Sequence, residues 1–145
     1  MATTTATLAL SSPDLVGDAL ALNTSKACYK AGTTIGLDQS TGLARVYLTA
    51  TTNVDIITVP GAVWAGKNAK VYIANLSTVD SEYIIVTKGG NVIGRLYAGD
   101  WMWMPMEQKA AHLSDVEIAP NVASGMWVEY MMVHEGVVLT TSADS

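Results

Sequence analysis

The chain has 145 residues, a length that fits one domain with its own core and no need of a disulfide or a metal. Its net charge is −5 and its eight Lys and Arg residues are scattered, which argues against nucleic acid as a partner, because phosphates are bound by clustered basic side chains. Charged residues make up only 14% of the chain and hydrophobic residues 50%, so either Ser and Thr cover the surface or part of it is buried against another protein.

No segment approaches the ~18 consecutive apolar residues of a membrane-spanning helix. The first residues also lack the basic and apolar regions of a signal peptide. We therefore expect no membrane partner.

Residues 1–18 are rich in Thr and Ser and contain Pro13, which predicts an N-terminal arm or an edge strand. Two alternatives stay open for this segment. Either the arm reaches a neighbouring subunit, or a strand over residues 5–10 pairs inside the chain's own sandwich. Residues 19–30 have an extended pattern without a clear register, and the glycines of residues 31–42 predict a long loop.

Short runs rich in β-branched and aromatic residues follow, separated by Gly, Asn, Asp and Ser, and they predict strands. The glycine pair of 88–91 predicts a tight hairpin turn, because glycine readily adopts φ > 0. In the run 115–119, Val116 and Ile118 are expected to point inward. Pro105 is expected to end the strand over residues 101–104. The predicted strands span residues 43–49, 54–59, 70–76, 82–87, 92–97, 101–104, 115–119 and 126–134.

The fold predicted from this pattern is all-β: an antiparallel β-sandwich of about nine or ten strands with a jelly-roll-like topology. We expect one sandwich domain over residues 19–140 and a flexible C-terminal tail over 141–145. Residues 107–114 have the pattern of a single helical turn.

The sequence predicts no catalytic, cofactor-binding or metal-binding residue, and the chain is not expected to be an enzyme. His112 and His134 have no second His or Cys at ligand spacing, and Cys28 has no cysteine partner. The carboxylate pairs are interpreted as solvated charge, with weak calcium binding as the alternative. These pairs are Asp14 with Asp18 and Asp115 with Glu117.

Aromatic and methionine residues concentrate in Trp101–Met104, where both faces of the expected strand are apolar. Such a strand has to be covered on both sides, which favours a central strand of the sandwich or a strand with one face at a subunit contact. The run Met126–Met132 has the same two-sided pattern and is a candidate to pair with it. The candidate core or interface residues are Trp101, Met102, Trp103, Met104, Met126, Trp127, Met131 and Met132. A glycan site at Asp100 and Trp101 with Arg95 is the weaker alternative.

The run KVYIANLSTVDSEYIIVTKGGNVIGRLYAGDWMWMP, followed by DVEIAPN and VEYMMV, resembles small virion proteins of tailed bacteriophages. The earlier YKAGTTIGLDQSTGLARV fits the same group, so the resemblance covers roughly residues 20–134. It rests on ordered β-motifs and on no invariant catalytic signature.

The resemblance implies a head-decoration (cement) protein on the outer capsid surface. Such a protein binds the major capsid protein, stabilises the head and commonly forms a homotrimer. The resemblance also extends to tail or fibre components, so a structural or receptor-binding β module is the alternative. The low charge and the two-sided apolar strands favour a homo-oligomer independently of the resemblance.

Overall fold

The computed structural model describes residues 4–15, 17, 19–57, 67–107 and 115–135. This part of the chain forms eleven strands, and every strand pair in it is antiparallel. The all-β sandwich class is thereby confirmed, whereas the jelly-roll order stays a prediction. The expected helical turn and the expected C-terminal tail fall on residues outside the described ranges, apart from residue 107.

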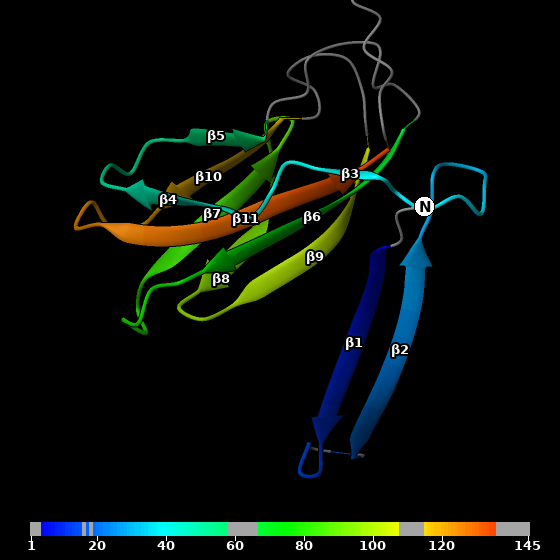
Figure 1. Ribbon diagram of the computed structural model, residues 1–145. Helices are drawn as coiled ribbons and strands as arrows, with labels where there is room; N and C mark the ends of the chain where they lie inside the picture. The colour runs from blue at the N-terminus through cyan, green and yellow to red at the C-terminus, as the bar shows by residue number, and fades with distance from the viewer. Residues whose placement is uncertain (1–3, 16, 18, 58–66, 108–114, 136–145) are drawn as a thin grey trace, which may run out of the picture.

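The N-terminal part of the chain is a long two-stranded hairpin. Strand β1 (Thr4–Ser12) pairs along its full length with β2 (Leu20–Cys28), and the two belong to neither of the larger sheets. Figure 1 shows this hairpin projecting away from the other strands. The hairpin thus joins the expected N-terminal arm to residues that the sequence pattern assigns to the sandwich. We call residues 4–28 the arm.

One sheet of the sandwich has four strands in the order β5, β10, β7, β8. Its members are β5 (Val54–Ile57), β10 (Val116–Pro120), β7 (Tyr83–Lys88) and β8 (Asn91–Tyr97). The β7–β8 turn places both Gly89 and Gly90 at positive φ, 58° and 85°, which confirms the predicted tight hairpin turn.

The other sheet has five strands in the order β3, β11, β6, β9, with β4 also pairing with β11. These are β3 (Gln39–Ser40), β11 (Met126–His134), β6 (Asn68–Asn75), β9 (Trp101–Glu107) and β4 (Ala44–Leu48). β4 and β3 pair with successive stretches of the same edge of β11, and β6 occupies the opposite edge.

The core lies between the two sheets and consists of the inward-facing residues of both. Val116 and Ile118 are fully buried, as their alternation predicts. Strand β6 contributes Ala69, Val71 and Ile73, all with no exposed surface, because it lies inside the five-stranded sheet. The main cluster also contains Leu48, Ile57, Ile84, Val86, Leu96, Met106, Met126, Val128 and Met132.

Strand β9 differs from the prediction in two ways. It is the edge strand of its sheet and not a central one, and β6 separates it from β11, so the two methionine-rich runs do not pair. It also continues through Pro105, which lies opposite Lys70. Proline is tolerated there because an edge strand has one side without a ladder partner, so the missing N–H breaks no hydrogen bond.

A buried asparagine connects the two sheets. Asn75 ends β6 with its side chain 1% exposed, and its Nδ2 donates to the carbonyl of Leu96 on β8 at 2.9 Å. Its Oδ1 accepts from the N–H of Ser77 at 2.9 Å. Its main-chain N–H donates to the carbonyl of Asp100, and its carbonyl accepts from Gly99. The β8–β9 turn is therefore fixed against the end of β6.

We expect Asn75→Ala to lower the free energy of unfolding by about 1–3 kcal/mol, because it removes the hydrogen bonds of the Asn75 side chain to the buried Leu96 carbonyl and the partly buried Ser77 N–H. Thermal or urea unfolding measures the loss. Asn23→Ala, at an exposed asparagine of the arm, is the control and should leave stability within about 0.5 kcal/mol of wild type. Equal stability of the two variants would contradict the role assigned to Asn75.

Candidate functional site

The five-stranded sheet has a second apolar face, directed away from the core. Because side chains alternate along a strand, the neighbours of the core residues on β6, β9 and β11 point outward. Register places Tyr72 of β6 between Trp103 of β9 and Met131 of β11. We call this surface the outer face, and its aromatic members are Tyr47, Tyr72, Trp101, Trp103 and Trp127.

Several of these rings are exposed. Trp101 is 55% exposed, and Tyr47 and Trp127 are 50% exposed each. Tyr47 and Trp127 lie opposite each other on β4 and β11, with ring centroids 4.9 Å apart. A soluble monomer rarely exposes neighbouring large rings on one face, so this surface is a candidate contact with another protein.

Glycine 125 sets the position of one of these rings. Its φ is +108°, and a Cβ built there would overlap the phenol ring of Tyr47. The absent side chain therefore lets Tyr47 lie across the start of β11 beside Trp127. No other residue type would allow both this backbone conformation and this contact.

A polar network crosses the middle of the outer face. Arg45 Nε donates to Glu129 Oε2 at 3.0 Å, and the Tyr72 hydroxyl donates to Glu129 Oε1 at 3.1 Å. Burial and the hydrogen bond to Glu129 raise the pKa of Tyr72, which keeps it protonated as the donor. Both oxygens of the Glu129 carboxylate thus accept a hydrogen bond. Among the described residues, Glu129 is the only carboxylate at the centre of the outer face.

The arm has one apolar and one polar face. Residues opposite each other in the hairpin share a face, so Leu8, Leu10, Leu20 and Leu22 lie on the same side. Leu10, Leu20 and Leu22 are 40–43% exposed. The opposite face holds only small or polar side chains: Thr5, Thr7, Ala9, Ser11, Ala21, Asn23, Ser25 and Ala27.

Among the described residues, only the base of the arm packs against the sandwich. Cys28 of β2 is buried with Leu37 and Val133, and partly buried Ala6, Trp103 and Met131 pack around them. A buried carboxylate fixes the chain that follows, since Glu135 Oε2 accepts from the N–H groups of Ala31 at 2.8 Å and Asn68 at 2.5 Å. The arm is thus anchored at one end.

A groove separates the arm from the outer face. It has a volume of about 950 Å³. One wall is the arm, including Thr7, Leu8 and Leu10, and the other is the outer face with Tyr72, Trp101 and Met131. Both walls are predominantly apolar.

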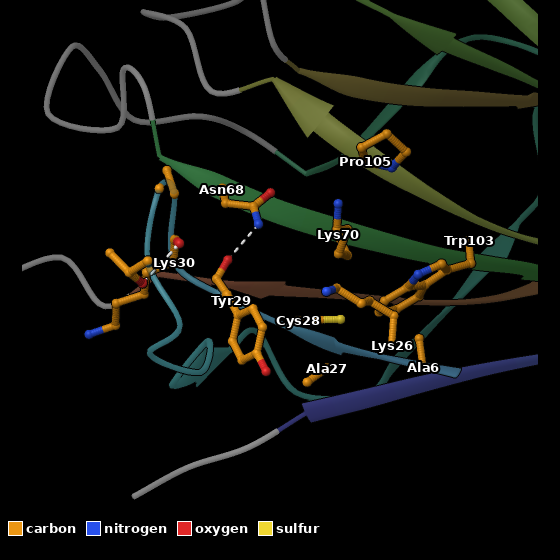
Figure 2. A pocket seen from close by; sticks show the side chains of 13 residues that line it. Ala6, Lys26, Ala27, Cys28, Tyr29, Lys30, Asn68, Lys70, Trp103 and Pro105 are labelled. Atoms are coloured by element: carbon orange, nitrogen blue, oxygen red, sulfur yellow. Dashed lines mark hydrogen bonds between the residues drawn. The ribbon is translucent and has the colours of Figure 1, made fainter. Parts of the chain in front are cut away.

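A second pocket lies at the base of the arm. It has a volume of about 490 Å³ and three lysines line it, namely Lys26, Lys30 and Lys70. Figure 2 shows Lys26 and Lys70 beside Trp103. Lys30 forms an ion pair with Asp38 at 3.0 Å, and the residues that line this pocket include no carboxylate. We call it the basal pocket.

The structure divides the eight candidate residues between the core and the outer face. Met126 and Met132 are buried in the core, and Met102 and Met104 pack against it. Trp101 and Trp127 are exposed on the outer face, whereas Trp103 and Met131 are partly buried against the base of the arm.

The residues considered for chemistry do not converge on one site. His134 is 7% exposed and its Nδ1 lies 2.8 Å from the carbonyl of Glu135, while His112 lies outside the described residues. Cys28 is a buried free thiol. Within the described ranges, no group of three or more His, Cys, Asp or Glu is placed to hold a metal ion. The described residues also include no helix long and apolar enough to cross a membrane.

The weaker glycan hypothesis is not favoured by the placement of its three residues. Asp100 Oδ2 accepts from the N–H of Tyr97 and so stabilises the β8–β9 turn. Arg95 stacks over the ring of Tyr83, 4.4 Å from its centroid, on the four-stranded sheet. Trp101 belongs to the other sheet, so the three side chains do not form one site.

Sequence reasoning missed Tyr47, Tyr72 and the leucines of the arm as surface residues. The leucines alternate at residues 8, 10, 20 and 22, which is the signal that a two-faced hairpin leaves in a sequence. Tyr47 and Tyr72 have no comparable signal, because their place on the outer face depends on the strand register.

Comparisons of the chain with known proteins give a distant structural similarity and no family. No protein-family model matches it, and no curated protein matches it. One solved structure similar to it is that of a de novo designed double-stranded β-helix. The match has 15% identity and a TM-score of 0.36, and it covers 66% of this chain and 100% of that one.

We predict that Trp103→Ala loosens the arm more than the sandwich. Trp103 is partly buried against the base of the arm, so its loss should cost less than the ~3–5 kcal/mol of a core indole. Trypsin cleavage after Lys26 should become faster, and Trp101→Ala, at an exposed ring of the same strand, is the control. Cleavage at the wild-type rate would contradict the anchoring role.

A second prediction concerns Glu117, which lies opposite Asp55 on neighbouring strands. The hydrogen bond with Asp55, then desolvation and the charges of Asp55 and Asp115, raise the pKa of Glu117. A carboxyl with a raised pKa favours the folded state when protonated, so this contribution is present at low pH and is lost as the pH rises through the raised pKa.

Glu117→Gln should therefore raise the Tm relative to wild type at about pH 7.5, and the difference should shrink near pH 4. Thermal unfolding at both pH values measures it. Asp80→Asn removes one charge at an exposed turn and is the control. A stabilisation by Glu117→Gln that is the same at both pH values would refute the prediction.

Proposed function

We propose that this chain is a structural virion protein, a capsid decoration or cement protein that binds the outer capsid lattice and stabilises the head. The main support is the amount of exposed apolar surface: the leucines of the projecting arm, the aromatic rings of the outer face and the apolar residues of β8. A protein with 14% charged residues that exposes such surfaces is suited to burying them on other protein chains. The role is structural and not enzymatic, with no cofactor.

The edge of the four-stranded sheet is the surface that we assign to the capsid. Strand β8 exposes Val92 at 69%, Ile93 at 46% and Tyr97 at 42%. The register shifts at Ile93, because Val86 lies opposite Gly94 whereas Thr87 lies opposite Val92. A bulge on an edge strand hinders the addition of another strand, so this edge offers apolar side chains for contact.

Stabilisation of the head follows from mass action. A protein that binds the assembled lattice and not the free subunits shifts the equilibrium toward the assembled shell. The partners in this proposal are the major capsid protein and further copies of the chain itself, with a trimer preferred. The location is the outer capsid surface of the virion.

The test is binding of the purified chain to empty heads of the virus whose genome encodes it. Sedimentation with heads should be saturable, whereas unassembled major capsid protein and host cells should retain little of the chain. Ile93→Asp should weaken head binding at least about tenfold, because it places a charge in an apolar contact. Asn91→Asp adds the same charge two residues away without removing apolar surface and is the matched control.

Binding to host cells in place of heads would favour the alternative, a receptor-binding module of a tail or fibre. Equal head binding by wild type and Ile93→Asp would disprove the assignment of β8. Absence of saturable head binding by the wild-type chain would disprove the decoration role itself.

A further inference from the structure

Within the residues that the structure describes, the apolar face of the arm stays largely exposed toward its end. Leu10 and Leu22 lie opposite each other near the end of the hairpin, and both are more than 40% exposed. A two-stranded hairpin is marginally stable by itself in water, so an arm of this length needs a surface to pack on. In the described ranges, its own sandwich provides that surface only at the base, around Cys28 and Trp103.

The groove between the arm and the outer face is predominantly apolar on both walls. The arm wall includes Ala6, Leu8 and Leu10 beside four threonines, and the sheet wall includes Trp101, Trp103 and Met131. A hairpin with an exposed leucine face can bring apolar side chains into such a groove. The arm is itself such a hairpin.

The distribution of charge favours one orientation of an arm that occupies the groove. The turn of the arm contains Asp14, whereas Thr4–Ser12 and Leu20–Ser25 contain no charged residue. The basal pocket holds three of the eight basic residues of the chain, and in the described part of the chain Lys26 and Lys70 form no ion pair. The acidic end and the basic end of one arm are therefore complementary.

One arm cannot bring its own two ends together. A strand of nine residues is about 30 Å long, so Asp14 is separated from the basal pocket of its own molecule by roughly that distance. An arm that enters from a second molecule in the opposite direction places its acidic turn at the basal pocket. The same placement lays its leucines on the aromatic rings of the outer face.

We infer that the groove receives the arm of a second copy of this chain, antiparallel to the resident arm, with its Asp14 at the lysines of the basal pocket. This arm exchange is reciprocal between two copies in a dimer. In a trimer, each arm enters the groove of the next copy around the ring. This contact lies between copies and uses neither β8 nor the capsid, so it stands or falls separately from the decoration role.

Cross-linking between two variants tests the contact directly. One population has Leu10→Cys and the other has Trp101→Cys, both in a Cys28→Ala background whose folding is checked by circular dichroism. The two are mixed and treated with a short bismaleimide. We expect a linked pair that joins one residue of each variant, identified by mass spectrometry.

Val79→Cys replaces Leu10→Cys in the matched control, because Val79 is 50% exposed and does not line the groove. A mixed product no more abundant than in this control would overturn the inference. In a double variant with both cysteines, linkage that stays within one chain, without mixed product between chains, would show that the arm closes on its own sandwich and would also overturn it.

Sedimentation equilibrium of the full chain gives the second measurement. Leu10→Asp and Leu22→Asp should each weaken self-association at least about tenfold. Ser11→Asp and Asn23→Asp introduce the same charge on the opposite face of the arm and should have a smaller effect. Asp14→Lys should weaken association, and the loss should be greater at low than at high ionic strength.

A wild-type chain that stays monomeric at high micromolar concentration would refute the exchange, as would equal association of Leu10→Asp and Ser11→Asp. Loss of head binding by Ile93→Asp with unchanged self-association would affect only the capsid assignment. Loss of self-association by Leu10→Asp with an unchanged thermal transition would support the exchange, because the arm lies outside the main core.

Discussion

The five-stranded sheet is apolar on both faces, and the second face has to be covered. Its inner face packs in the core through residues such as Val71 and Ile73, which have no exposed surface. Its outer face presents Trp101, Trp127 and Tyr47, each at least half exposed. A sheet of this kind is normally found with both faces packed, as in layered folds. The arm, the groove and the inferred contact between copies are all consequences of this constraint.

Anchoring explains why the arm stands beside the outer face without closing on it. Cys28 and Leu37 are buried at its base, and the Glu135 carboxylate holds the chain after β2 close to the start of β6. These contacts fix the direction of the hairpin, while the leucines farther along β1 and β2 have no contact with the core. The groove is therefore open on the side from which another chain can enter.

Sequence analysis identified the elements whose residue pattern is compatible with a single local structure. Alternation in β10 and the glycine pair before β8 predict a strand and a turn in any surroundings, and both are confirmed. The two-sided apolarity of β9 is compatible with a central strand or with a covered edge, so the pattern alone could not place it. Pro105 is compatible with an edge strand that continues through it, whereas the sequence pattern alone predicts that the strand ends there. The outer face was harder still, because Tyr72 joins it only through a register set by two other strands.

A protein with exposed apolar surface and few charges tends to aggregate. It avoids aggregation if one specific association geometry is favoured over the others. The polar network of Arg45, Glu129 and Tyr72 restricts how a partner can bind. An incoming chain has to leave these hydrogen bonds intact while it covers the rings around them. Residues 4–12 and 20–25 of the arm carry no charge and add no repulsion, and its Asp14 adds attraction only when it lies at a basic site. A partner that matches the apolar walls but runs in the wrong direction would place that carboxylate against the aromatic end of the groove. The distribution of a few charges over a largely uncharged chain thus selects one geometry from several that would bury the same apolar area.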